Sequence, residues 1–364
     1  RTLFTSFFDK FPLPHLRGRG KGGGGVNNYG QFTDQMFYAA HFMDPLIWEP
    51  YVHWVCQQHG FDCRQMSPGL PGSFPTFIVE VDAADIQSST PYIVVKLFGP
   101  LCDGANSFLI EQAVANTLAE HSLPIHSPSI LAQGRLSAEW SYLIFEHIPG
   151  VSIGEVREQL STEAWMTLAD QMGVFMRALH NATTNGKLII PIQEPTRGWE
   201  EFAEFLEKQR CLCTTNHQQW KDLPSHLIEQ LPAYLPPVDE LLDLSSSPHL
   251  IHADLTADHV LGRQANHDWQ TLAIIDWGDA RVGNILYELV ALHVDLFQAD
   301  RHLLQQCLKA YQLPAFYQPD FPRKALSMVL LHQFPMPVQI VAPHQQVPSL
   351  NELAERLFRV EVAG

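Results

Sequence analysis

Hydrophobic and polar positions divide the chain into a part with short apolar segments and a part with helical spacing. The short apolar segments are bounded by turn-forming residues, which is typical of β-strands. They are Phe77–Val81, Tyr92–Phe98 and Tyr142–Glu146. Residues 107–120 repeat apolar positions every three or four residues, which predicts a helix between the second and third strands.

Helical spacing dominates after Gly150. Ser161 can cap a helix that continues to His180, because its hydroxyl can accept a hydrogen bond from a backbone N–H of the first turn. Amphipathic segments also cover Trp199–Gln209 and Tyr287–Tyr311, and helical patterns continue toward the C-terminus. A strand-rich first part and a helix-rich second part predict an α+β fold with two lobes.

Composition narrows the class of protein. The chain has 364 residues, 46% of them hydrophobic, which is enough for two folded units and excludes general disorder. Its formal net charge of −16 argues against a general binder of nucleic acid or anionic membranes. No apolar run reaches the roughly 20 residues that a membrane span needs. The first residues, Arg1-Thr-Leu-Phe4, do not begin a signal-peptide layout. The 6 cysteines show no zinc spacing. We expect a cytoplasmic protein with reduced thiols.

The first sixty residues differ from the rest of the chain. Arg17–Gly25 is rich in glycine and basic residues, a composition typical of a mobile linker. No Gly-Lys-Ser/Thr follows, so this run does not match a nucleotide P-loop. A helix is predicted over Pro45–His59. The expected division is residues 1–60 for an N-terminal extension, 61–148 for a β-rich N-lobe and 149–364 for a helical C-lobe.

Two aspartates follow short apolar segments in the second part. Asp254 follows Leu250-Ile-His-Ala, and Asp276 follows Ile274-Ile. A carboxylate at the end of a buried strand suits a catalytic base or a Mg²⁺ ligand. Two such carboxylates in one segment favour both roles together, as phosphoryl transfer requires.

Lys96 lies near the end of the apolar strand Tyr92–Phe98. A buried ammonium is costly unless it is paired, and Glu111 on the following helix is its natural partner. Such a pair could hold the lysine ready for the phosphates of a nucleotide.

Together these features resemble the protein-kinase-like fold and, within it, the aminoglycoside and choline phosphotransferases. That family typically has His-Gly-Asp-x-x-x-x-Asn, then Ile-Asp-Phe/Trp, then Gly-Asp-Pro-x-x-Asp-Leu. This chain has His252-Ala-Asp254, Ile275-Asp276-Trp277 and Gly283-Asn-Ile-Leu-Tyr-Glu288-Leu. The resemblance covers roughly Gly69 to His293. It implies a bilobal fold with a small β-rich N-lobe, which binds the nucleotide, and a larger, mostly helical C-lobe with the catalytic loop and acceptor site.

The resemblance also implies a reaction, the ATP-dependent transfer of the γ-phosphate to a hydroxyl of a small-molecule acceptor. Asp254 would accept the proton of that hydroxyl, and Asp276 would hold Mg²⁺. His252 would order the catalytic loop through hydrogen bonds. Lys96, held by Glu111, would contact the phosphates. The other nucleotide contacts implied are Gly72, Ser73 and Phe74 over the phosphates, and Glu146, His147 and Ile148 as a hinge beside the adenine.

The chain departs from the family pattern at the second metal ligand, where His259 replaces Asn. Mg²⁺ prefers oxygen donors, and an imidazole is a poor substitute. Three interpretations stay open: a water-mediated or nitrogen-ligated metal, takeover by the adjacent Asp258, or a weakened site. Ala253 replaces Gly, a mild change unless the backbone there needs a positive φ. Asn284 and Glu288 replace two aspartates and can still cap or accept hydrogen bonds.

Two other functions compete with an active phosphotransferase. With its second metal ligand altered, the chain could be a nucleotide-binding, pseudokinase-like module. Alternatively, His252-x-Asp254 with a distant histidine such as His293 or His332 would form the facial triad of a non-haem Fe(II) oxygenase. That fold needs strands around the metal, whereas the sequence after His293 predicts helices.

The acceptor is expected to contact helices of the second lobe, over about Trp199–Tyr234 and Leu286–Phe334. Acidic residues there could attract an amine-bearing acceptor, although surface solvation explains them equally well. They are Glu200, Glu201, Glu288 and Asp295. An aminoglycoside, a choline-like compound, a sugar or another alcohol fits the sequence equally.

Overall fold

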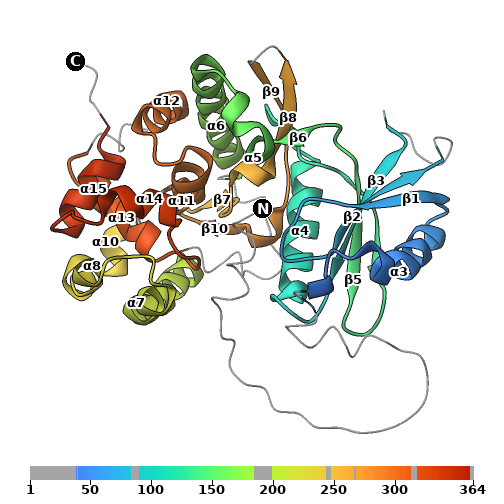
Figure 1. Ribbon diagram of the computed structural model, residues 1–364, viewed down its shortest axis with the longest axis horizontal. Coiled ribbons are helices and arrows are strands. Elements are labelled where there is room, and N and C mark those ends of the chain that lie inside the picture. The colour runs from blue at the N-terminus through green and yellow to red at the C-terminus, as the bar shows by residue number, and fades with distance from the viewer. Residues whose placement is uncertain are drawn as a thin grey trace, which may run out of the picture. The chain divides into compact units, whose positions relative to one another are not determined.

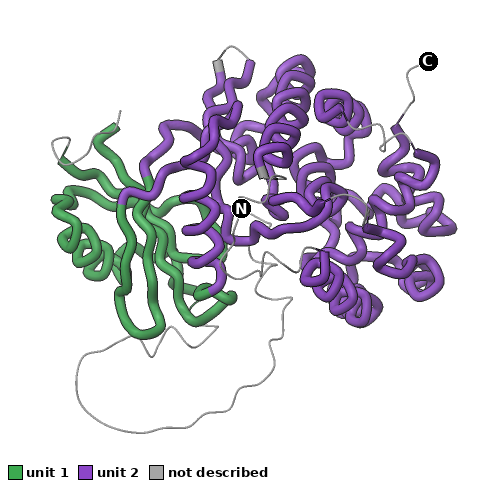
Figure 2. Tube along the Cα trace, turned by 180° about the vertical axis from the view of Figure 1, so that it is seen from behind, with its two compact units in different colours: residues 1–105, 132–145 green, residues 106–131, 146–364 purple. Residues whose placement is uncertain are grey.

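The computed structural model describes residues 38, 40–82, 90–183, 199–242, 247–265, 268–312 and 318–360. It divides into two units, one of Arg1–Ala105 with Ala132–Phe145 and one of Asn106–Leu131 with Glu146–Gly364 (Figure 2). The predicted linker Arg17–Gly25 lies outside the described residues. The predicted functional division at residues 60 and 148 stays a prediction.

A five-stranded sheet, with strand order β1-β2-β3-β5-β4, forms the framework of the first unit (Figure 1). Its strands are β1 Cys63–Pro68, β2 Thr76–Val81, β3 Tyr92–Phe98, β4 Ile130–Arg135 and β5 Ser141–Glu146. β2 pairs antiparallel with both β1 and β3. The three strands predicted from apolar segments are confirmed as β2, β3 and β5.

Both strands that the sequence pattern missed, β1 and β4, lie at the edges of this sheet. β1 exposes Arg64, Gln65 and Ser67, and β4 exposes every second residue. An edge strand packs against the core through fewer side chains, so its sequence need not be apolar. Because β1 precedes the predicted phosphate-covering residues, Gly72–Phe74 lie in the connection between two antiparallel strands.

Helix α3, Pro45–Gln58, confirms the helix predicted at the end of the extension. Asp44 caps it by accepting a hydrogen bond from Leu46 N. Its buried face includes Trp48 and Val52, and the ring of Trp48 lies 5.2 Å from that of Trp140, centroid to centroid. This part of residues 1–60 therefore belongs to the core of the first unit.

The second unit is mostly helical, as predicted, and contains nearly all of α4 (Figure 1). Its helices are α4 Gly104–Leu118, α5 Ile153–Val156, α6 Thr162–Thr183, α7 Glu200–Trp220, α8 Ser225–Ile228, α9 Leu231–Tyr234, α10 Val238–Leu241, α11 Ile285–Ala291, α12 Arg301–Tyr311, α13 Phe321–Leu330, α14 Val338–Val341 and α15 Leu350–Phe358. The predicted cap of α6 is confirmed, because Ala164 N donates to Ser161 Oγ at 3.1 Å. Within the described part of the chain, no helix is both long and apolar enough to cross a membrane.

The helical pattern predicted from Tyr287 to Tyr311 is divided between two α-helices. α11 is followed by a π-helical turn, η5, over Leu292–Leu296, and α12 then begins anew. Asp300 caps α12 by accepting a hydrogen bond from His302 N at 2.8 Å. A single π-helical turn within helical sequence often accompanies a functional site.

Two small sheets position both aspartate-bearing segments. β7 His249–Ile251 pairs with β10 Arg281–Gly283, and β6 Val151–Ser152, β8 Val260–Ala265 and β9 Asp268–Ile274 form the other sheet. Residues 252–259, which the family resemblance predicts to be the catalytic loop, join β7 to β8. In the β8–β9 hairpin Val260 pairs with Ile274, so the chain after β9 returns beside His259. Both aspartates therefore follow strands, as the apolar pattern predicted.

A buried ion pair joins the end of α7 to the segment after α13. His217 Nδ1 lies 2.9 Å from Asp222 Oδ1, and His217 Nε2 donates to Leu330 O at 3.0 Å. Met336 N donates to the second carboxylate oxygen of Asp222 at 2.8 Å. Burial is the largest single influence and would lower the pKa of His217, but the hydrogen bonds and charges of Asp222 and Cys213 together outweigh it and raise this pKa to about 10. The imidazolium is thus the form that the core stabilises.

We predict that Asp222→Ala lowers the free energy of unfolding by about 3–5 kcal/mol near neutral pH, because it leaves a buried charge unpaired. In the native chain the pKa of His217 is raised from 6.5 to about 10. The pair therefore contributes fully below about pH 6.5 and is lost as the pH rises toward 10. Urea unfolding across this range should show the loss in the native chain and not in Asp222→Ala. Parallel pH profiles would contradict the assignment.

Candidate active site

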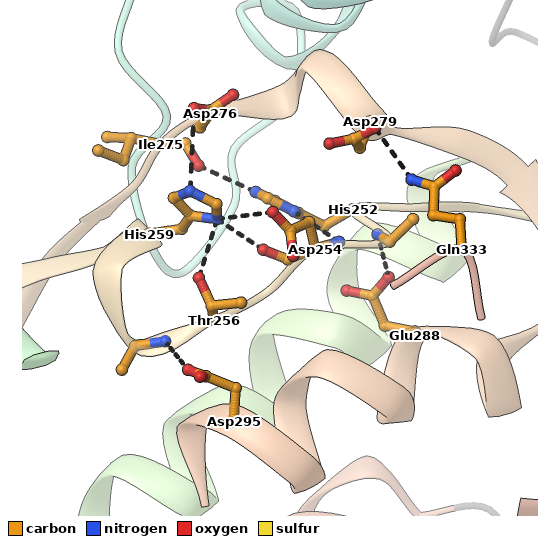
Figure 3. A network of polar contacts seen from close by, with 12 residues as sticks. His252, Asp254, Thr256, His259, Ile275, Asp276, Asp279, Glu288, Asp295 and Gln333 are labelled. Atoms are coloured by element: carbon orange, nitrogen blue, oxygen red, sulfur yellow. Dashed lines mark hydrogen bonds and ion pairs between the residues drawn. The ribbon is translucent and has the colours of Figure 1, made fainter. Parts of the chain in front are cut away.

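His252 ties the two aspartate-bearing segments together (Figure 3). Its Nε2–H donates to Ile275 O at 2.9 Å, and its Nδ1 accepts from Asp254 N at 3.3 Å. Burial lowers the pKa of His252 to about 3, so the ring is neutral, and it lies against Trp277 with a centroid distance of 4.5 Å. Both ring nitrogens are therefore used in hydrogen bonds to the backbone.

Ala253 has a positive φ of 66°. This is the position at which the family has glycine, so the replacement carries a real conformational cost. Glu288 on α11 holds the loop in this conformation, because its Oε2 accepts a hydrogen bond from Ala253 N at 3.0 Å. Glu288 is fully buried, and burial raises its pKa to about 7.

Asp295 on η5 holds the other end of the catalytic loop. Its Oδ1 accepts a hydrogen bond from Ala257 N at 2.8 Å. Arg157, on the short 3-10 helix η2 (Arg157–Gln159), donates to the carbonyls of Asp295 and Leu296 at 3.1 and 2.8 Å. Glu288 and Asp295, two of the four acidic residues that could attract an acceptor amine, both accept hydrogen bonds from backbone N–H groups of the loop.

Asp254 lies between these two anchors. Its side chain is 22% exposed. Burial raises the pKa of Asp254 well above its usual range; nearby His259 opposes this shift, and the carboxylates of Asp279 and Asp276 add to it. A carboxylate with a raised pKa is a better proton acceptor than an ordinary aspartate at neutral pH. Asp279, which sequence reasoning did not identify, is held by a 3.2 Å hydrogen bond from Gln333 Nε2.

His259 lies between Asp254 and Asp276 (Figure 3). Its Nδ1 lies 2.6 Å from Asp254 O and 3.1 Å from Thr256 Oγ1. On the other side of the ring, His259 Nε2 lies 3.8 Å from Asp276 Oδ2. Asp276 itself has a φ of 63°, so the chain turns sharply after β9 and presents this carboxylate beside the histidine. The structure thus brings the predicted base, the predicted metal ligand and the unusual residue together.

The Asp258 carboxylate lies against α5. A methyl group added at Gly154 of that helix would clash with Asp258 Oδ1. Across the ranges that the structure describes, no three His, Cys, Asp or Glu side chains form a group that could hold a metal ion. Asp276 supplies the oxygen donor that suits Mg²⁺, whereas His259 supplies a nitrogen that suits Mg²⁺ poorly.

Of the residues predicted over the phosphates, Phe74 lies beside Lys96 in the first unit. Lys96 is 5% exposed, and its Nζ lies 5.7 Å from the ring centre of Phe74 and 5.3 Å from that of Phe98. Ser73 O accepts a 2.7 Å hydrogen bond from Tyr38 OH. Gly72, Ser73 and Phe74 therefore lie just before β2, whose first residue Thr76 pairs with Lys96 of β3.

Glu111 and the predicted hinge belong to the second unit with the catalytic loop. Glu111 is 4% exposed, and a methyl group at Gly278 would lie 3.7 Å from its Oε2, which places this carboxylate beside the Asp276–Gly278 turn. Glu146 Oε1 lies 2.8 Å from His126 Nε2 and accepts from Ser129 N at 2.7 Å. His147 and Ile148 follow directly. The pairing of Lys96 with Glu111 and the adenine contacts stay predictions.

Comparison with known proteins assigns the family. The phosphotransferase enzyme family (APH) matches residues 72–323, well over half of the chain. The chain therefore belongs to this family. The lysine-specific demethylase JMJ21 of Arabidopsis thaliana is 24% identical over 235 residues, covering 54% of this chain and 24% of the demethylase. The chain thus spans about a quarter of that relative.

Two solved structures show the fold. The GDP complex of an aminoglycoside 2'-phosphotransferase has a TM-score of 0.58 at 18% identity, over 86% of this chain and 97% of that one. The GDP and kanamycin complex of an APH(2") enzyme has a TM-score of 0.57 at 18% identity, over 85% and 97%. The fold is the predicted α+β kinase-like fold, with a small β-rich N-lobe and a larger helical C-lobe.

Replacing Ala253 by glycine should stabilise the chain by about 1 kcal/mol, because glycine adopts a φ of 66° without steric cost. Thermal or urea unfolding of Ala253→Gly measures this. Ala280→Gly is the matched control: Ala280 has a φ of −59°, so its replacement should destabilise. Destabilisation by both substitutions would contradict the assigned strain.

Glu288→Gln should change how stability depends on pH. The pKa of Glu288 is raised from 4.5 in the unfolded chain to about 7 in the folded one. Its contribution is therefore full below about pH 4.5 and is lost as the pH rises to about 7. Glutamine keeps an oxygen for Ala253 N and cannot ionise, so urea unfolding of Glu288→Gln should lack this loss. The exposed Glu240→Gln serves as control. An unchanged profile in Glu288→Gln would exclude the proposed titration.

Proposed function

We propose that the chain is an ATP-dependent phosphotransferase that moves the γ-phosphate to a hydroxyl of a small-molecule acceptor. The observation that carries this proposal is that the hydrogen bonds of His252 hold the segments of Asp254 and Asp276 together, in a chain of a phosphotransferase family. Asp254 would accept the proton of the acceptor hydroxyl. Asp276 would hold the divalent cation, with Mg²⁺ the ion that the family resemblance implies.

The residues proposed to bind the nucleotide are those that the family resemblance implies. Lys96, buried in the first unit, would contact the phosphates, and the Gly72–Phe74 turn beside it would cover them. Glu146 to Ile148 would bind the adenine through their backbone. A bound divalent cation would neutralise phosphate charge during transfer. Mg²⁺ is commonly held by one or two carboxylates together with substrate phosphates, a role that the Asp276 carboxylate fits.

The acceptor is proposed to be a hydroxyl compound, with an aminoglycoside as one candidate. The APH(2") complex with kanamycin shares this fold, which supports an acceptor of that size and chemistry as a starting point.

The two competing functions receive less support. A pseudokinase-like module would not need a carboxylate whose pKa is raised beside a second aspartate, as Asp254 has. In the Fe(II) oxygenase alternative His252 would be a metal ligand, but both its ring nitrogens are used in backbone hydrogen bonds. His332 Nε2 lies 3.4 Å from Ala253 O, and His293 Nε2 donates to Leu357 O.

Asp254→Asn should lower kcat for acceptor phosphorylation by about 10²–10⁴-fold, because the amide cannot accept the proton. Binding of ATP, followed by calorimetry, should be retained, since the substitution keeps the shape of the side chain. Asp239→Asn, at an exposed position of α10, is the control and should leave kcat unchanged. Full activity in Asp254→Asn would overturn its role as base.

A further inference from the structure

The orientation of the His259 ring is fixed by its surroundings. Its Nδ1 lies 2.6 Å from the carbonyl oxygen of Asp254, and a carbonyl only accepts, so Nδ1 carries a proton and donates it there. Thr256 Oγ1, 3.1 Å away, supports the same nitrogen. The backbone is held as well, because Ile275 N donates to His259 O at 3.0 Å. In the neutral ring the lone pair is then on Nε2.

Nε2 is the nitrogen that faces Asp276. It lies 3.8 Å from Asp276 Oδ2, and the side chains of His259 and Asp276 are 17% and 33% exposed. Two donors on one ion at bond lengths of about 2.1 Å lie roughly 3.0 Å apart at a right angle and farther apart at wider angles. A shift of less than about 1 Å would therefore let both atoms bind the same ion.

This arrangement has the form of a metal-binding histidine. Such a residue usually donates its other ring N–H to a carbonyl or carboxylate, which fixes the tautomer and aims the free lone pair at the metal. Here the Asp254 carbonyl performs that task. An imidazole nitrogen suits first-row transition ions such as Mn²⁺ better than Mg²⁺, which prefers oxygen.

We propose that His259 Nε2 and Asp276 Oδ2 together bind the nucleotide-associated cation, and that this nitrogen makes the site prefer Mn²⁺ over Mg²⁺. The inference rests on the proposed function, since the cation is expected to bind with the nucleotide. It assigns His259 a ligand role in place of the weakened-site interpretation, and it excludes takeover by Asp258, whose carboxylate lies against Gly154.

The test uses Mn²⁺ bound to the full chain with a non-hydrolysable ATP analogue. Pulsed electron paramagnetic resonance detects a nitrogen bonded directly to Mn²⁺. We expect a directly bound imidazole nitrogen in the native chain and in His302→Asn, which replaces an exposed histidine of α12. His259→Asn should lose this signal while still binding the analogue. A signal that persists in His259→Asn, or that is absent from the native complex, overturns the proposal.

Calorimetric titration with Mn²⁺ and with Mg²⁺, each with the same analogue, gives the second readout. The ratio of the two affinities should favour Mn²⁺ in the native chain and fall by about tenfold or more in His259→Asn. Thr256→Val should lower this affinity ratio by a smaller factor than His259→Asn does. Equal ratios in the native chain and His259→Asn, with the analogue bound in both, overturn the metal preference and leave the proposed function standing. Failure of the native chain to bind the analogue with either ion would overturn both.

Discussion

The site depends on how one helical segment holds the backbone of the catalytic loop. Glu288 of α11 accepts from Ala253 N, and Asp295 of η5 accepts from Ala257 N. These two hydrogen bonds hold the two ends of the loop against the buried carboxylate of Glu288 and the partly exposed carboxylate of Asp295, and Ala253, directly before Asp254, has a φ of 66°. Asp254 lies between these two anchored residues in the chain, and each hydrogen bond stabilises the loop in this conformation.

This frame explains the electrostatics of the site. Asp254, Asp276 and Asp279 are held near one another, and burial together with their mutual repulsion raises the pKa of Asp254. A bound cation would relieve that repulsion, and His259 beside Asp276 offers it a nitrogen donor. The substitution of His for Asn thus changes which ion the site would hold, while the loop that carries Asp254 keeps its anchors.

The α+β class was predictable from the sequence because the central strands are apolar and the helices repeat apolar positions at helical spacing. β2, β3 and β5 each have a neighbouring strand on both sides and were predicted. The edge strands β1 and β4 carry polar residues and were missed. The two aspartates were found because each follows a strand. The structural roles of Glu288 and Asp295 were not predicted, because a carboxylate that binds a backbone N–H has no periodic signature in the sequence. Arg157 was missed as well, because an arginine that donates to backbone carbonyls has no such signature either.

Phosphoryl transfer from ATP to a small-molecule hydroxyl is tested most directly by phosphorus NMR of the native chain with ATP, a divalent cation and a panel of hydroxyl acceptors. We predict that the γ-phosphate signal declines and a phosphomonoester signal on one acceptor rises in equal amount. ATP that binds and stays intact with every acceptor, under Mn²⁺ as well as Mg²⁺, would contradict the account.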